Sequence, residues 1–434
     1  MKRVLFIMQS YPSERSANVD CDEKIINELK KNKEIEIYCL VYRYNYQSLF
    51  EEYTGFKVYR YKKGLLFDLY SWARHHEKSS IGILLLRLHR LLLLAKELIL
   101  VPIYPYIEPV GMRQCAIEAI KLHKRIHFDL VFADHNGLDT LYAGKKLKDY
   151  DPNIKFIAMM WDPILGKNKA KYVTKTFHEK RSIKAQKLLV KNADLIIMLE
   201  SAKSVYFQSK YSIDYMDRIQ FCSIPGVIQP EENKGELSAD VSDLFESGKF
   251  NIVYTGIITT DRDPAHFIRI IDSCSCANKI NIVFFCPRDS AEVINAIKTN
   301  KVSVRTHDYI DKKALNLVYH LADGYLNLGG LEANMIPSKL FNYISYGKPI
   351  ISTFMVVDDP SVKCLRKYPL SYCVDMRAID KYSAEELNSF IECKGKEILA
   401  FETVQQLYHK STPSVYVNMI QDQMGVDEHN GKGA

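Results

Sequence analysis

The sequence predicts two α/β domains, each with a parallel sheet covered by helices on both faces. Short apolar runs typical of buried strands alternate with stretches of about 10–15 residues that have helical periodicity. The chain has 434 residues, enough for two or three domains at ~150 residues each. A polar stretch at 225–249, with two prolines and three glycines, separates two series of such elements.

The first series predicts a domain over residues 1–228. Its strands are expected at 4–8, 35–41, 130–133, 156–160, 195–199 and 219–224, and its helices at 21–31, 81–100, 111–126, 137–148 and 178–191. The apolar run at 4–8 is too short for the core of a signal peptide, so we interpret it as the first buried strand.

The second series predicts a domain over 250–399, joined to the first by a linker at 229–249. Its strands are expected at 251–256, 280–285, 302–305, 324–328, 350–353 and 372–374, and its helices at 264–273, 290–299, 311–322, 337–346 and 382–393. A last helix over 400–424 is expected to pack back on the first domain, ahead of a frayed tail at 425–434. Open α/β sheets bind ligands at the carboxyl ends of their strands.

The charge is unevenly distributed along the chain. The formal net charge is +7, too weak by itself to predict nucleic-acid binding. Residues 1–234 hold 38 basic and 27 acidic side chains, whereas residues 235–434 hold 21 and 25. Two segments, 60–98 with a net +5 and 163–191 with a net +8, carry the excess. The first domain is therefore expected to meet an anionic partner.

The leucine-rich segment at 81–103 is long enough for a membrane helix. Arg87, Arg90, Lys96 and Glu97 interrupt it, and no uncharged apolar stretch exceeds six residues, so it does not fit a spanning helix. Two interpretations stay open: a helix lying in an anionic membrane interface, and a core helix whose Arg and Lys stems cover apolar surface. The partner predictions therefore include a peripheral membrane contact through 60–103 and 163–191.

The ten cysteines are scattered along the chain. Cys274 and Cys276 form a C-x-C pair without the second pair that a zinc site requires. We interpret the cysteines as small buried hydrophobic residues in a reducing compartment. The cysteines therefore predict a cytoplasmic protein. The membrane contact described above would place it on the inner face of the cell membrane.

The most informative motif lies at 323–353. The strand expected at 324–328 leads through Gly329-Gly330 to Pro337-Ser338, a favourable helix start, and the helix is expected to stop at Gly347. A helix start at the carboxyl end of a strand is an anion site. Lys339 adds a positive charge there, so the motif predicts a phosphate or diphosphate site.

The string P-S-K-L-F-x-Y-x-x-x-G-K-P-I-I over 337–351 resembles the nucleotide-sugar signature of GT-B glycosyltransferases. It is most similar to the retaining, family-four-like enzymes of bacterial surface-polysaccharide assembly. The resemblance implies two Rossmann-like domains facing a central cleft. It also implies a nucleotide-sugar donor whose diphosphate lies at Pro337, Ser338 and Lys339, with no metal or other cofactor.

Two positions depart from that family's pattern. The family usually carries a pair of glutamates eight positions apart, and here Asn334 and Asn342 stand in their places. The resemblance implies that Asn334 contacts the donor sugar and Asn342 the ribose. An amide still hydrogen-bonds a hydroxyl but carries no charge. Glu332, two residues before Asn334, is a substitute acid at the donor sugar.

A second group of residues follows the strand expected at 251–256. The resemblance implies that Gly256 belongs to the donor-binding residues and that a basic residue lies against the diphosphate. Arg262 is the candidate, because its planar guanidinium fits phosphate oxygens; its alternative is a salt bridge within the turn. Residues 261–263 also spell D-x-D, a metal motif of another glycosyltransferase fold, which we interpret as a coincidence.

Two polar residues are candidates for the acceptor side. His135 follows the strand at 130–133 and Asp162 follows the strand at 156–160. Both stand at strand carboxyl ends, where they would orient an acceptor or assist proton transfer. A helix-cap environment is the alternative for His135. The loop at 10–18 contains no glycine, and the chain has no G-x-G-x-x-G, so a nicotinamide site is not supported.

These observations predict a hexosyltransferase-like enzyme. It would move a sugar from a nucleotide-sugar donor to a glycan or polyprenyl-diphosphate-linked acceptor. The resemblance implies a role in surface-polysaccharide biosynthesis and retention at the anomeric carbon. A nucleotide-sugar epimerase of the same fold and a non-catalytic nucleotide-binding protein are the alternatives. Nucleic acid is not an expected partner.

Overall fold

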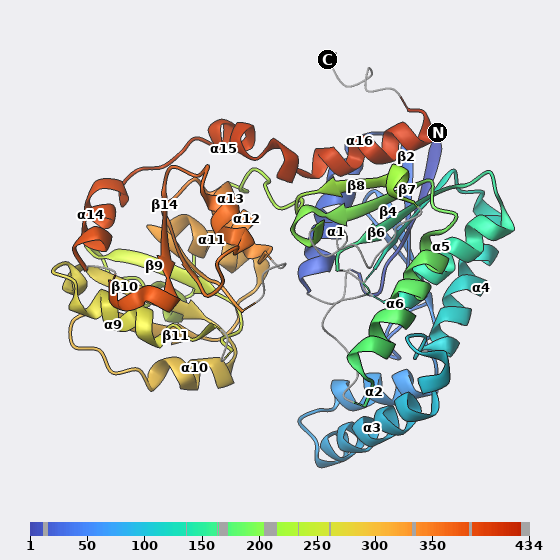
Figure 1. Cartoon of the computed structure of the whole chain (residues 1–434), viewed down its shortest axis with the longest axis horizontal. Helices are drawn as coiled ribbons and strands as arrows, with labels where there is room; N and C mark the ends of the chain where they lie inside the picture. The colour runs from blue at the N-terminus through green and yellow to red at the C-terminus, as the bar shows by residue number, and fades with distance from the viewer. Residues whose placement is uncertain are drawn as a thin grey trace. The chain divides into compact units, whose positions relative to one another are not determined.

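The chain forms two compact units (Figure 1). Unit 1 comprises Met1–Pro225 and Pro413–Ala434, and unit 2 comprises Gly226–Thr412. The computed structural model describes residues 1–11, 16–135, 137–162, 164, 172–203, 215–232, 234–259, 262–331, 336–381 and 384–426.

Unit 1 is built on an eight-stranded sheet with the order β3-β4-β2-β1-β5-β6-β7-β8. The strands are β1 (Lys2–Ile7), β2 (Ile35–Tyr42), β3 (Phe50–Tyr53), β4 (Phe56–Tyr61), β5 (Leu130–Asp134), β6 (Lys155–Met160), β7 (Leu195–Leu199) and β8 (Ile219–Cys222). All pairs are parallel except β3 with β4. Parallel strands are covered on both faces, which explains why their sequences are continuous apolar runs.

Helices cover both faces of this sheet (Figure 1). They are α1 (Ala17–Leu29), α2 (Leu65–His75), α3 (Ser80–Ile99), α4 (Pro109–Ile126), α5 (Leu138–Tyr150), α6 (Lys175–Val190) and α16 (Pro413–Met424). α4 packs on α5, and α1 packs on the returning α16. Within unit 1, the hydroxyl of Tyr416 donates to the carbonyl of Ser223 at 2.7 Å, which fixes α16 beside the end of β8.

Unit 2 contains a six-stranded, wholly parallel sheet with the order β11-β10-β9-β12-β13-β14. Its strands are β9 (Phe250–Thr255), β10 (Ile280–Phe285), β11 (Ser303–His307), β12 (Gly324–Leu328), β13 (Ile350–Phe354) and β14 (Ser371–Asp375). The order places the first three strands outward in one direction and the next three in the other. This is the Rossmann arrangement, with β9 and β12 at the point where the winding reverses.

The helices of unit 2 connect these strands. They are α8 (Ala239–Ser242), α9 (Ala265–Ser273), α10 (Arg288–Asn295), α11 (Lys312–Leu321), α12 (Lys339–Ser345), α13 (Pro360–Leu365), α14 (Ala384–Lys394) and α15 (Phe401–Leu407). The expected single helix over 400–424 is instead broken, because Pro413 has no N–H to continue the ladder. α15 belongs to unit 2 and α16 to unit 1.

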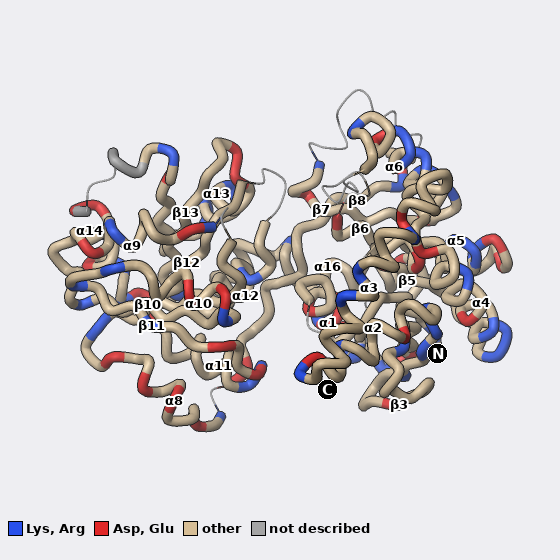
Figure 2. The backbone as a smooth tube through the Cα atoms, turned by 90° about the horizontal axis from the view of Figure 1, so that it is seen from below, with Lys and Arg blue, Asp and Glu red and all other residues tan. Residues whose placement is uncertain are grey.

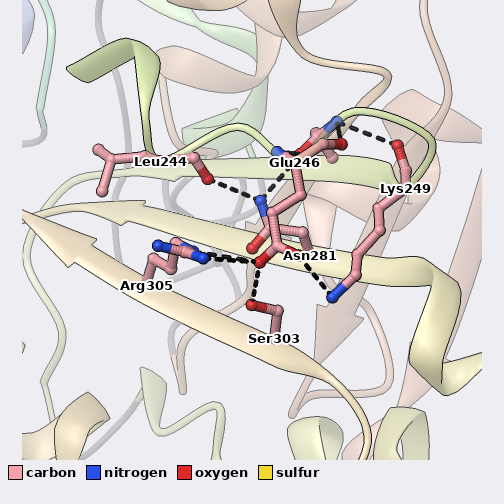
Figure 3. Close-up of polar contacts among 7 residues, drawn as sticks. Leu244, Glu246, Lys249, Asn281, Ser303 and Arg305 are labelled. Atoms are coloured by element: carbon pink, nitrogen blue, oxygen red, sulfur yellow. Dashed lines mark hydrogen bonds and ion pairs between the residues drawn. The ribbon is translucent and has the colours of Figure 1, made fainter. Parts of the chain in front are cut away.

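The segment expected to be a linker, 229–249, lies within unit 2, and its end is anchored to the sheet (Figure 3). The amide of Asn281 on β10 donates to the carbonyl of Leu244 at 2.8 Å. The Glu246 carboxylate accepts from Lys249, Ser303 and Arg305, with Lys249 at 2.7 Å and Arg305 at 3.0 Å. These contacts lower the pKa of Glu246 to about 2, and the hydrogen bond from Lys249 contributes most to that shift.

Three elements of unit 1 were not expected from the sequence: β3, β4 and α2. β3 is an edge strand that pairs antiparallel with β4, and Gly55 between them has φ +87°. Charged residues fall inside both strands, as is common near a sheet edge, and they hide the apolar pattern that marks the buried strands. Within the described residues, no helix is long and apolar enough to cross a membrane.

Candidate active site

The centre of the candidate site in unit 2 is Lys339, the first residue of α12. Its ammonium group reaches the end of β9, where Nζ donates to the carbonyl of Thr255 at 2.7 Å. Nζ also lies 3.7 Å from the centre of the Tyr254 ring. The lysine therefore joins the start of α12 to the carboxyl end of the neighbouring strand.

Arg262 approaches the same place from the loop after β9. A Cβ atom placed on Gly330 would lie 3.5 Å from Arg262 Nε, so the guanidinium lies against the loop after β12. Desolvation, reinforced by the charge of Arg262, holds the pKa of Lys339 well below its ordinary value. Within the described part of the chain, neither cation forms an ion pair with a carboxylate. The buried Asp359 carboxyl interacts with Arg262 only at longer range, without a hydrogen bond or ion pair between them. Two adjacent cations that no ion pair neutralises favour an anionic ligand.

Gly256 makes room for Lys339. It has φ +131°, and a Cβ atom there would lie 2.9 Å from Lys339 Nζ. Both the backbone conformation and the space exclude a side chain at this position. Glycine at this position therefore leaves space for the Lys339 ammonium group.

Tyrosines that we did not predict support the end of β9. The amide of Thr255 donates to the hydroxyl of Tyr343 at 3.0 Å. The hydroxyl of Thr255 lies 2.9 Å from that of Tyr319 and 3.1 Å from that of Tyr343. The Tyr343 ring stacks on Tyr325 with 4.7 Å between centres, and burial raises the pKa of Tyr343 to about 12. Tyr343 belongs to the P-S-K string, which is the signal that could have identified it.

The start of α12 differs from the expectation. Ser338 has helical dihedral angles, and its side chain forms no capping hydrogen bond with the described residues. Instead, the backbone carbonyls of Pro337 and Ser338 accept hydrogen bonds from the amides of Leu340 and Phe341, each three residues further along the chain. α12 spans seven residues, so the positive charge of the site comes from the lysine and the arginine more than from a helix dipole.

The remaining predicted donor residues are only partly covered by the structure. Asn342 lies on α12, one turn beyond Lys339, and is half-buried. Pro337 is also half-buried. Glu332 and Asn334 lie outside the described residues, as does Asp261 of the D-x-D sequence. Among the residues that the structure does describe, no group of three or more His, Cys, Asp or Glu is placed to hold a metal ion.

In unit 1 the structure brings His135 and Asp162 together. His135 Nδ1 lies 3.0 Å from the backbone carbonyl of Asp162, while the Asp162 side chain is exposed. Because a carbonyl only accepts, Nδ1 carries the proton, and Nε2 keeps a lone pair. Burial lowers the pKa of His135, and the bond to Asp162 opposes that shift. His135 is thus a neutral base at the carboxyl end of β5.

A pair of buried acids near the same strand end was not predicted. Asp22 on α1 and Asp134 at the end of β5 are both 0% exposed. Burial raises the pKa of Asp22 well above its usual range, and the neighbouring Asp134 raises it further. Two such carboxyls cannot both ionise, so the pair holds a proton. Nothing in the sequence distinguishes Asp22 from an ordinary surface acid of a helix.

No model of a known protein family and no curated protein sequence matches this chain. Solved structures match it over nearly its whole length. A UDP-forming α,α-trehalose-phosphate synthase from Burkholderia xenovorans aligns with a TM-score of 0.63 and 10% identity, covering 100% of both chains. A sucrose-phosphate synthase from Thermosynechococcus elongatus has a TM-score of 0.62 and 10% identity, covering 98% of this chain and 99% of its own.

A third structure is the Anabaena protein HepE in complex with UDP and glucose. It has a TM-score of 0.56 and 10% identity, covering 98% of this chain and 100% of its own. These likenesses show the fold: the chain consists of two Rossmann-like domains of the GT-B type. The predicted fold class is confirmed.

Proposed function

We propose that this protein is a glycosyltransferase that binds the diphosphate of a nucleotide sugar at Lys339 and Arg262. The observation that carries the proposal is the pair of cations without a carboxylate partner at the carboxyl ends of β9 and β12. The GT-B fold and the complex of HepE with UDP and glucose support it. In this fold a diphosphate would replace the carbonyl of Thr255 as the main partner of Lys339.

The chemistry follows from where charge develops. When the bond between the anomeric carbon and the diphosphate oxygen breaks, negative charge grows on the leaving nucleoside diphosphate. Fixed positive groups stabilise that charge more than they stabilise the bound donor, and this lowers the barrier. We assign this role to Lys339 and Arg262, assisted by the backbone at Pro337 and Ser338, and the proposal gives no role to a metal.

The other donor contacts are proposed from the family resemblance. Asn342 would hold the ribose, and Asn334 and Glu332 would contact the sugar. His135 would accept the proton of the acceptor hydroxyl at Nε2, and Asp162 would orient that hydroxyl. We also propose retention at the anomeric carbon, and a glycan or polyprenyl-diphosphate acceptor in surface-polysaccharide biosynthesis. Such an acceptor implies a cytoplasmic protein at the inner face of the membrane.

Calorimetric titration with UDP and GDP tests the donor site. We expect one of the two to bind, and Lys339→Ala to weaken that binding, whereas Lys394→Ala on α14, which pairs with Glu397, should leave it unchanged. If neither nucleoside diphosphate binds, both the transferase and the epimerase are excluded. Binding without transfer or hydrolysis of any nucleotide sugar, in the presence of cell lipids, would favour the non-catalytic alternative.

A further inference from the structure

The helical hairpin formed by α2 and α3 presents an apolar face that no other part of the described chain covers. Leu84, Leu91 and Leu98 follow one another at seven-residue intervals, and they are 64%, 65% and 56% exposed. Gly82 and His89 lie on the opposite, buried side of α3. Further exposed apolar residues of the helix are Ile81, Ile83, Leu88, Leu92, Leu94 and Ile99.

Specific contacts hold this hairpin in place. α2 and α3 approach closely, because a Cβ atom on Gly82 would lie 2.0 Å from the carbonyl of His76. Ser79 caps α3 by accepting from the amide of Gly82 at 3.0 Å. At the other end, Lys96 forms an ion pair with Glu108. The outward direction of the leucines is therefore fixed by the packing of the inner side.

The hairpin carries more basic than acidic side chains, and the exposed acid Glu77 pairs with Arg74. Arg87 and Arg90 are exposed on α3, and the acid of the same helix, Glu97, accepts a hydrogen bond from Tyr172 at 2.7 Å. α6 begins close by, with Arg181 donating to the carbonyl of Pro102, and carries five basic residues and one acid. A second copy of the chain would place these arginines against each other, whereas anionic headgroups would neutralise them.

We propose that the outward face of α3, together with Trp72 of α2, docks onto the surface of an anionic membrane. The helix would lie in the plane of the interface, with its leucines among the upper acyl chains and its arginines at the headgroups. Trp72, on the α2 helix of the same hairpin, is 38% exposed, and tryptophan favours that boundary. Figure 2 shows unit 1 from the side on which α2 and α3 lie.

This inference names the partner surface that the proposed lipid-linked acceptor requires. It is tested on the full chain without donor or acceptor, so it can fail independently of the glycosyltransferase proposal. The assay is co-sedimentation with phosphatidylcholine vesicles that contain either no phosphatidylglycerol or about one-third of it. We expect the anionic vesicles to bind the protein at least ~10-fold more strongly than the neutral ones.

Variants separate the apolar and the charged contributions. The double variant Leu84→Glu and Leu91→Glu should lose at least ~10-fold in vesicle affinity, because charges replace two exposed leucines that would enter the acyl chains. Ile398→Glu is the matched control, since Ile398 in unit 2 is 66% exposed, and it should bind as the unmodified protein does. Arg87→Glu with Arg90→Glu should lose roughly 10-fold on anionic vesicles alone.

Three results would overturn the proposal. The first is that the unmodified protein fails to sediment with anionic vesicles, and the second is that the double leucine variant still binds them fully. The third is that, without lipid, sedimentation velocity shows a dimer that the double leucine variant converts to a monomer. The apolar face would then be an interface between two copies of the chain.

Discussion

The two sheets of this protein carry opposite chemistry at their carboxyl ends. In unit 2, Lys339 and Arg262 lie together without a carboxylate partner among the described residues. In unit 1, the neighbouring acids Asp22 and Asp134 are both buried. His135 is neutral there, and its Nε2 keeps a lone pair. One unit therefore carries two adjacent basic side chains, and the other a neutral imidazole that can accept a proton. The proposed transfer would use both.

The largest expected effect comes from removing the cation of unit 2. Lys339→Ala should weaken nucleoside-diphosphate binding by roughly 100-fold, because a poorly solvated charge pair is lost. Arg262→Ala should cost roughly 10-fold, since Lys339 would remain to bind the diphosphate. Calorimetry measures both, with Lys394→Ala as the control. Equal, small effects of all three variants would place the diphosphate elsewhere.

The second effect is a pH dependence of nucleoside-diphosphate affinity, which arises from Lys339 in unit 2. The pKa of Lys339 is depressed in the free protein, and a bound diphosphate would raise it again. Binding therefore takes up a proton wherever the free lysine is neutral, and affinity should fall by up to ~10-fold per pH unit as pH rises between the two pKa values.

Calorimetry in buffers of different ionisation enthalpy detects this proton uptake. The uptake should disappear in Lys339→Ala. An affinity that does not change with pH, or an uptake that survives the substitution, would contradict the role given to this lysine.

The third prediction concerns stability and belongs to unit 1. The pKa of folded Asp22 is raised above its unfolded value, so its contribution to stability is full at low pH and is lost as pH rises through the folded pKa. Asp22→Asn mimics the protonated acid. Near neutral pH it should raise the free energy of unfolding by about 1 kcal/mol relative to the unmodified protein.

The difference should vanish below the ordinary pKa of aspartate, about 4. Asp217→Asn is the control, because Asp217 is an exposed acid of the same unit. Urea denaturation followed by fluorescence measures these differences. An Asp22→Asn protein that is less stable at neutral pH would show that the buried pair is ionised.

The smallest effect is expected from the tyrosines beneath Lys339. Tyr343→Phe removes the hydroxyl that accepts from the Thr255 amide, so the carbonyl beside Lys339 loses one restraint. We expect nucleoside-diphosphate affinity to fall about fivefold, the size of one ordinary hydrogen bond. Tyr372→Phe, whose hydroxyl donates to Glu386 at 3.3 Å, is the control and should change nothing. If Tyr343→Phe lowered only the stability of the protein and left the nucleoside-diphosphate affinity unchanged, Tyr343 would have no role in the binding site.

The sequence predicted the strands of unit 2 more fully than those of unit 1, although the short helices α8 and α13 of unit 2 were not expected. The expected strands at 280–285 and 324–328 coincide with β10 and β12, because both are short apolar runs between clear turn residues. Lys339 could be singled out because the P-S-K string carries it. The edge strands β3 and β4 escaped prediction, since charges interrupt them.

The buried acids could not have been predicted either. The burial of Asp22 depends on α16, which packs on α1 from nearly 400 residues further along the chain. No local pattern records such a contact. The helix start at Pro337-Ser338 was predicted, but a serine there can cap the helix, and the Ser338 side chain does not. The first turn of α12 instead has hydrogen bonds between backbone groups, and this depends on the loop before it.

A crystal structure of the protein with a bound nucleoside diphosphate tests the central claim most directly. The account predicts a diphosphate oxygen within about 3 Å of Lys339 Nζ and a second one facing the guanidinium of Arg262. A diphosphate bound elsewhere, with Lys339 still donating to the carbonyl of Thr255, would contradict it.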